Sequence, residues 1–118
     1  MDLSAVITRG VAATDRILWL AVIASAACST SGLSPDDWYP VSVTVDGARR
    51  EAAAAIKVCD TCRVRHECLE LALRNAAVGR HGVWGGTVPA EREELRTRRV
   101  AHLGRALAAM RDSDRTAS

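Results

Sequence analysis

Apolar and polar positions divide the chain into helix-length segments. Thr14 and Asp15 suit a helix start, and the run Ile17–Cys28 that follows is apolar on nearly every side. A helix of that kind needs burial on more than one side, either under the rest of the domain or under a partner protein. Residues 48–58 are rich in strong helix formers, and residues 62–77 have the apolar content of a further helix. The pattern therefore predicts three helices before residue 78.

A fourth helix is predicted from Pro89, because proline suits the first turn of a helix. Four apolar residues recur along it at 3-4-3 spacing and form one face: Val100, Leu103, Leu107 and Met110. Before it, residues 79–86 hold four glycines, which predict a tight turn. The alternating segment Val41–Val45 has no partner strand and is interpreted as extended loop. We predict an all-α fold of about four helices.

The 118 residues fit one small domain. Residues 16–77 are predicted to form the helices that carry the cysteines, 79–88 the glycine and tryptophan turn, 89–111 a basic C-terminal helix, and 112–118 a polar tail. Aromatic residues are scarce and alanine is abundant, so the core should be thin. A bound metal centre would cross-link such a core.

Net charge is only +2, but basic residues gather near the C-terminus. No acidic residue occurs from Leu95 to Met110, where four arginines are candidates for DNA binding: Arg96, Arg98, Arg99 and Arg105. They can meet phosphate or an acidic protein face, or simply form a solvated helix face. Arg92, Arg96 and Arg99 share one side of the helix and can instead pair with nearby glutamates.

The four cysteines are Cys28, Cys59, Cys62 and Cys68, with the spacing C-x30-C-x2-C-x5-C. Four thiolates suit either tetrahedral zinc or an iron–sulfur cluster. Structural zinc sites usually use two short cysteine pairs, and only one is present, so the spacing favours iron–sulfur. His66, four residues after Cys62, keeps zinc open as an alternative.

Two other interpretations of the cysteines are possible. Cys59 and Cys62 form a C-x-x-C, which suits a protein disulfide reductase, but that chemistry normally follows a strand in a βαβ fold that this sequence lacks. The run Ile17–Cys28 has some likeness to a signal peptide or lipoprotein cleavage site. Asp2 and Asp15 stand where positive charge belongs, and the run is shorter than the about 20 residues that span a bilayer, so we expect neither export nor membrane insertion.

The order of these features resembles the WhiB-like family of actinobacterial transcription regulators. The resemblance covers Cys28 to about Arg105. It includes the remote cysteine, the C-x2-C-x5-C group, the sequence Gly82-Val83-Trp84-Gly85-Gly86 and the basic final helix. Ala27-Cys28 followed by Pro35-Asp36-Asp37-Trp38-Tyr39-Pro40 is similar to the family's A-C…D-P-x-x-F-F-P segment.

The resemblance implies a 4Fe–4S cluster held by all four cysteines, in a mostly helical cytoplasmic protein that is not an enzyme. It implies binding to the principal sigma factor of RNA polymerase through the glycine turn, with Trp84 as a projecting anchor. It implies contact of the basic helix with promoter DNA, and a response to redox state or nitric oxide. No membrane and no small-molecule substrate are expected.

Two features depart from the family. The helix before Cys28 is usually more polar, which indicates a different partner surface here. The family's basic tail is sometimes an AT-hook of the R-G-R-P type, and none occurs in this sequence. Trp84 also has a plainer interpretation as a core residue, although flanking glycines give it little local packing.

Overall fold

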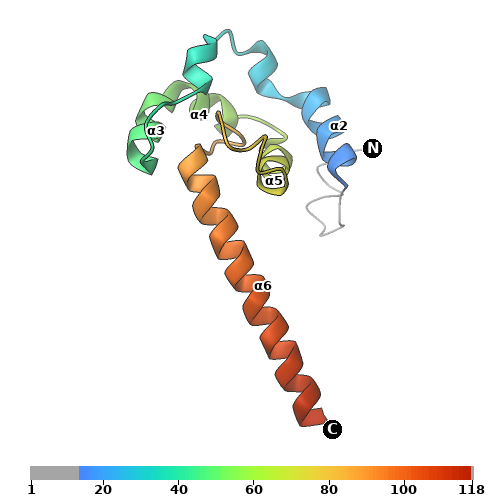
Figure 1. The fold of residues 1–118 in the computed structure, drawn as a ribbon. Helices are drawn as coiled ribbons and strands as arrows, with labels where there is room; N and C mark the ends of the chain where they lie inside the picture. The colour runs from blue at the N-terminus through green and yellow to red at the C-terminus, as the bar shows by residue number, and fades with distance from the viewer. Residues whose placement is uncertain (1–13, 118) are drawn as a thin grey trace.

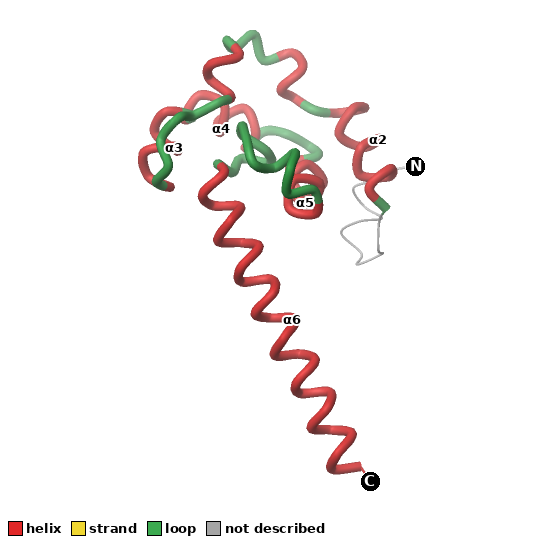
Figure 2. Tube along the Cα trace, viewed as in Figure 1, coloured by secondary structure: helices red, strands yellow, loops and turns green. Residues whose placement is uncertain are grey.

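The computed structural model describes residues 14–117, and they form the predicted all-α fold (Figures 1 and 2). The helices are α2 (Asp15–Ser25), α3 (Val45–Glu51), α4 (Ala53–Asp60), α5 (Arg65–Arg74) and α6 (Pro89–Ala117), with the 3₁₀ turns η1 (Ala27–Thr30) and η2 (Pro35–Trp38). The β pairing found in this part of the chain is one isolated bridge between Trp84 and Thr87. No helix in it is long and apolar enough to cross a membrane.

Helix α2 begins where the sequence predicts, because the Thr14 side chain accepts a hydrogen bond from the backbone N–H of Ile17 at 3.3 Å. It packs on α5, where Leu18 and Leu71 are fully buried against each other. Within the described residues burial on a second side is not found, since Leu20 is 52% and Ile23 75% exposed. Of the two predicted kinds of burial, cover by the rest of the domain is therefore not seen in these residues, and cover by a partner protein stays a prediction.

The predicted helix over residues 48–58 is two helices. Thr44 caps α3 by accepting from the N–H of Gly47, so the helix starts at Val45, and α3 and α4 are separated at Ala52. The apolar row continues across this break: Ala48, Ala52 and Ile56 pack together with Val88. The predicted helix over residues 62–77 is shorter, because α5 runs from Arg65 to Arg74.

The largest fully buried side chain is that of Arg92, near the start of α6. Its guanidinium donates hydrogen bonds to the carbonyl oxygens of Gly79, His81, Gly82 and Thr87, at 2.6–3.2 Å. Burial and nearby Arg96 lower the pKa of Arg92 to about 10, so it stays charged at neutral pH. Arg92 therefore holds the glycine turn against α6; neither a phosphate contact nor pairing with a glutamate describes its position.

Helix α6 extends away from the other helices (Figure 1), and the whole molecule is 61 Å along its longest axis. It continues to Ala117, so the helix is longer than the predicted range 89–111 and includes most of the predicted polar tail; Ser118 lies outside the described range. Arg99 of α6 pairs with Glu70 of α5 at 2.9 Å and so connects this part of α6 to the helices around the cysteines. Beyond it the helix is exposed on all sides through residue 115.

Arg92→Ala is expected to lower the free energy of unfolding by about 3 kcal/mol or more, because it leaves several buried carbonyl groups without a donor. Urea denaturation followed by circular dichroism measures this change. Arg98→Ala is the matched control: Arg98 is exposed on the same helix, and its loss should change stability by less than about 0.5 kcal/mol. Equal stability of the two variants would contradict the structural role of Arg92.

Candidate metal centre

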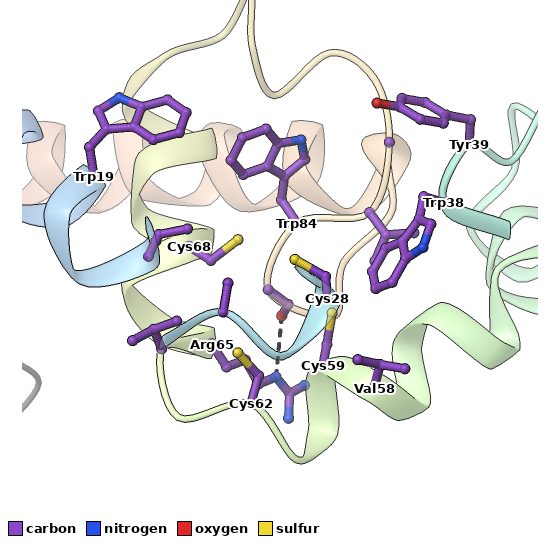
Figure 3. Close-up of a pocket in the computed structure, with 16 residues that line it drawn as sticks. Trp19, Cys28, Trp38, Tyr39, Val58, Cys59, Cys62, Arg65, Cys68 and Trp84 are labelled. Carbon is purple, nitrogen blue, oxygen red and sulfur yellow. Dashed lines mark hydrogen bonds between the residues drawn. The ribbon is translucent and has the colours of Figure 1, made fainter. Parts of the chain in front are cut away.

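The four cysteines line one cavity of about 370 Å³, as the sequence predicts for a common site (Figure 3). They come from three elements and the turn after one of them. Cys28 lies on η1, Cys59 lies in the last turn of α4, Cys62 lies in the turn that follows α4, and Cys68 lies on α5. All four are free thiols. Cys59 is buried and Cys28 is exposed, so the cavity has one side close to solvent.

Local hydrogen bonds place Cys59 and Cys62 beside η1. The N–H of Cys62 donates to the carbonyl of Cys59 at 3.0 Å, which turns the chain sharply after α4. The sulfur of Cys62 accepts from the N–H of Ala27 at 3.5 Å, next to Cys28. The two cysteines are thus brought together by a turn after α4, whereas the sequence pattern placed the group on a helix.

The glycine turn is a tight two-residue hairpin. Trp84 and Thr87 exchange backbone hydrogen bonds at 3.1 and 3.0 Å, and the two residues between them, Gly85 and Gly86, have φ of +56° and +77°. Positive φ at both central positions is the geometry of a type I′ turn, which strongly favours glycine. The Gly-Gly pair in the sequence is therefore required by the backbone.

The same hairpin lies directly against α5 and the cysteines. A Cβ on Gly85 would lie 2.5 Å from the carbonyl oxygen of Arg65 and 2.7 Å from Cβ of Leu69. This close approach lets backbone hydrogen bonds from Gly85 and Gly86 reach Cys68 and Cys59. Burial raises the pKa of both thiols, that of Cys68 to about 12, and these hydrogen bonds act in the opposite direction.

Arg65 is the charged residue that lines the cavity together with the four cysteine thiols. Its Nε donates to the carbonyl of Gly85 at 3.2 Å, and its guanidinium pairs with Asp60 at 3.2 Å. Its positive charge favours the thiolate of Cys59. Arg65 therefore ties the hairpin to the start of α5 and offsets negative charge in the cavity. Its place in the sequence between Cys62 and Cys68 indicates the second role but not the first.

Aromatic side chains form much of the cavity wall. Trp19 of α2 and Trp84 of the hairpin meet edge to face, with ring centroids 6.0 Å apart and planes at 84° (Figure 3). The indole N–H of Trp84 donates to the carbonyl of His81 at 3.1 Å. Trp84 is half-buried: its ring packs on Trp19, and part of its surface stays in solvent, between the projecting and the core positions that the sequence left open. The sequence analysis did not select Trp19. It lies three residues before Val22, which also lines the cavity, so the two share one face of the helix.

Other predicted site residues divide between the interior and the surface. Gly82, Gly85 and Gly86 are buried, and Val83 packs against the core, so the backbone of the turn faces the cavity. Arg96 donates to the carbonyls of Ala72 and Leu73. Arg99 pairs with Glu70, whereas Arg98 and Arg105 are exposed and form no ion pair within residues 14–117.

The site does not match a single bound ion. Within the described range, no three His, Cys, Asp or Glu side chains come together in a way that could hold one metal ion. His66, the candidate zinc ligand, is exposed and does not line the cavity. The cavity that the four sulfurs line, about 370 Å³, has room for a group larger than one zinc ion.

Gly85→Ala is expected to destabilise the chain by more than about 3 kcal/mol, because positive φ costs about 1–2 kcal/mol and the added Cβ overlaps α5. Gly32→Ala is the control: Gly32 also has positive φ, at +71°, but a Cβ there meets nothing within 4 Å. Its cost should be the conformational part alone, measured by urea denaturation under anaerobic conditions. Similar losses in the two variants would contradict the close approach of the hairpin to α5.

Comparison with known proteins agrees with this arrangement. The family model described as Transcription factor WhiB matches residues 23–95, more than half of the chain. Transcriptional regulator WhiB of Streptomyces coelicolor is 44% identical over 62 residues, which are 52% of this chain and 62% of that protein. Transcriptional regulator WhiB2 of Mycobacterium tuberculosis is 42% identical over 62 residues, 52% of this chain and 61% of that protein.

The match thus spans about three fifths of the length of these curated relatives. No solved structure shows a significant match to the chain. The matched residues 23–95 include all four cysteines and the complete glycine hairpin, whereas Trp19, which also lines the cavity, lies outside the match. The chain belongs to the WhiB family of transcription factors.

Proposed function

We propose that the chain is a cytoplasmic transcriptional regulator whose four cysteines hold a 4Fe–4S cluster, and that it acts through the principal sigma factor and promoter DNA. One observation carries the proposal: four free thiols from three separate elements line a single cavity. Family membership supports regulation of transcription as the setting. The cluster, when bound, supplies a centre that responds to redox state and nitric oxide.

The chain's own residues suit such a centre. Four cysteines are the ligand set of a 4Fe–4S cluster. Hydrogen bonds from the hairpin to Cys59 and Cys68, together with the charge of Arg65, favour thiolates that burial alone would disfavour. Trp19 and Trp84 limit the approach of water on one side, while exposed Cys28 lies where a small diatomic molecule has access.

The disulfide reductase alternative is disfavoured by the position of the C-x-x-C pair. Reactive dithiols have a thiol whose pKa is lowered, commonly at a helix N-terminus. Cys59 instead lies in the last turn of α4, the negative end of the helix, and burial raises the pKa of its thiol. These residues are better suited to binding metal than to exchanging disulfides.

The hairpin offers a route from the cavity to a partner. Gly85 contacts α5 beside Cys68, and Trp84, the residue before it, lies at the edge of the cavity with part of its surface in solvent. Loss of the cluster would remove one link between the hairpin and α5, leaving the hydrogen bond from Arg65 to Gly85, and so would alter the surface at Trp84. Arg98 and Arg105 are the arginines best exposed for promoter phosphates, since Arg96 and Arg99 have partners within the chain.

Anaerobically reconstituted protein is expected to be brown, to contain iron and acid-labile sulfide in equal amounts, and to lose its visible absorbance on exposure to nitric oxide. Cys28→Ala should abolish or strongly reduce the iron content, because one ligand would be missing. Thr30→Ala, in the same turn, is the control and should keep full iron content.

The outcomes separate the alternatives. Colourless protein that contains zinc would replace the cluster with a structural metal. Full iron content in Cys28→Ala would remove that residue from the ligand set. An unchanged spectrum after nitric oxide would exclude the sensing role while leaving the cluster as a structural element.

Trp84→Ala is expected to weaken binding of the C-terminal domain of the principal sigma factor by about 30-fold, which corresponds to about 2 kcal/mol at an interface hot spot. Trp19→Ala is the matched control, since it removes the other ring of the same pair. Both variants should lose cluster absorbance faster in air, but only Trp84→Ala should lose sigma binding. Calorimetry and visible spectroscopy on each variant measure the two effects, and equal sigma binding by both would remove Trp84 from the interface.

A further inference from the structure

We propose that Glu70 of α5 competes with DNA phosphates for Arg99 of α6, and so limits the affinity of this chain for DNA. The inference rests on the proposed contact of α6 with promoter DNA and concerns what restrains that contact. Both carboxylate oxygens of Glu70 accept hydrogen bonds from Arg99: Oε1 from Nη1 at 3.1 Å and Oε2 from Nη2 at 2.9 Å. Arg99 thus has an acidic partner on a neighbouring helix.

The pair between Glu70 and Arg99 has the geometry with which arginine also binds phosphate. Two parallel N–H···O bonds join a guanidinium to two oxygens of one anion, and a carboxylate and a phosphate fit this arrangement equally well. The Nη1 and Nη2 atoms of Arg99 that would bind a phosphate in this way already bind Glu70. Contact with DNA through these atoms therefore requires that the contact with Glu70 is lost.

A second arginine holds the Glu70 carboxylate in place. Nε of Arg74, which lies one turn later on α5, donates to Oε1 of Glu70 at 2.9 Å. Arg74 also pairs with Asp15 of α2 at 3.5 Å, so it remains bound when Glu70 is altered. Of the two arginines that contact Glu70, Arg99 is therefore the one that loss of the carboxylate would make available to DNA.

Arg99 lies next to the exposed arginines that are proposed to meet DNA. It directly follows Arg98, and it is three residues before His102, which shares one side of α6 with Arg98 and Arg105. The side chain of Arg99 is 45% exposed even when it is paired, and that of Glu70 is 26% exposed. An ion pair open to solvent contributes little to stability, so a phosphate can replace the carboxylate without unfolding this junction.

Arg96, the other arginine of α6 that α5 binds, is held differently. Its guanidinium donates to the backbone carbonyls of Ala72 and Leu73 at 2.6 and 3.3 Å. It also pairs with Glu93 at 3.5 Å, but the Glu93 side chain is 78% exposed. Removal of the charge on Glu93 leaves Arg96 bound to the two carbonyls, which makes Glu93→Gln a matched control for Glu70→Gln.

Fluorescence anisotropy with a short DNA duplex of mixed sequence, on the full chain prepared anaerobically, measures affinity as salt is varied. Glu70→Gln is expected to bind about fivefold more tightly than the unaltered chain at low salt. The slope of log K against log[salt] should steepen by about 0.9, because one more phosphate is contacted. Glu93→Gln removes the same charge and should leave the slope unchanged. Circular dichroism checks that each variant is folded.

Arg99→Ala distinguishes the release of this arginine from a general effect of charge. In the unaltered chain it should change the affinity for the duplex by less than about twofold, because Glu70 already binds the side chain. In the Glu70→Gln chain it should cancel the gain in affinity and restore the original slope. Weaker binding by Arg99→Ala alone, or a gain from Glu70→Gln that persists without Arg99, overturns the proposal.

The same titrations separate this inference from the proposed function. A chain that binds the duplex, but gains no more from Glu70→Gln than from Glu93→Gln, overturns the competition and leaves the DNA contact standing. If neither the unaltered chain nor Glu70→Gln binds the duplex at low salt, the proposed DNA contact is wrong and the competition is wrong with it.

Discussion

The buried guanidinium of Arg92 is the interaction on which the rest of the site depends. It binds carbonyl oxygens at both ends of the glycine turn, from Gly79 to Thr87, and so fixes the turn against the start of α6. Arg49 and Arg65 donate to the carbonyls of Gly86 and Gly85 in the same turn, but four of its carbonyls accept from Arg92. Buried carbonyls without donors are costly. Once the turn is fixed there, the hairpin at Gly85 is held against α5 and completes the cysteine cavity.

The apolar core is too small to do this work. Its two clusters contain mainly alanine and short aliphatic side chains, with Leu18 and Leu71 in one and Val88 in the other. Polar contacts to the backbone therefore position much of the molecule: Arg65 to Gly85, Arg92 to the turn, and Arg96 to the end of α5. A centre bound by four thiolates would add a cross-link between η1, α4 and α5.

The sequence predicted the helical class, the start of α2 at Thr14 and the tight turn at the glycines, because capping residues and glycine pairs act locally. It also predicted that four cysteines share a site. It did not predict the break at Ala52, the helical end of the chain or the buried position of Arg92. These depend on tertiary contacts, since an arginine on a helix surface and an arginine beneath a loop have the same local pattern. The contact of Trp84 with Trp19 was missed for the same reason, because the two residues are distant in sequence.

The hairpin belongs to both the cavity and the surface, which limits how a signal can pass between them. Gly85 and Gly86 donate toward the cysteines while Trp84, one residue earlier, lies at the edge facing solvent, so any movement away from α5 changes both sides together. Arg92 restrains the opposite end of the same turn and connects it to α6. A change in the cysteine ligands therefore has a short physical path to the tryptophan surface. Its path to the basic helix runs along the chain through Thr87 and Val88, which join the hairpin to α6, and through the buried side chain of Arg92.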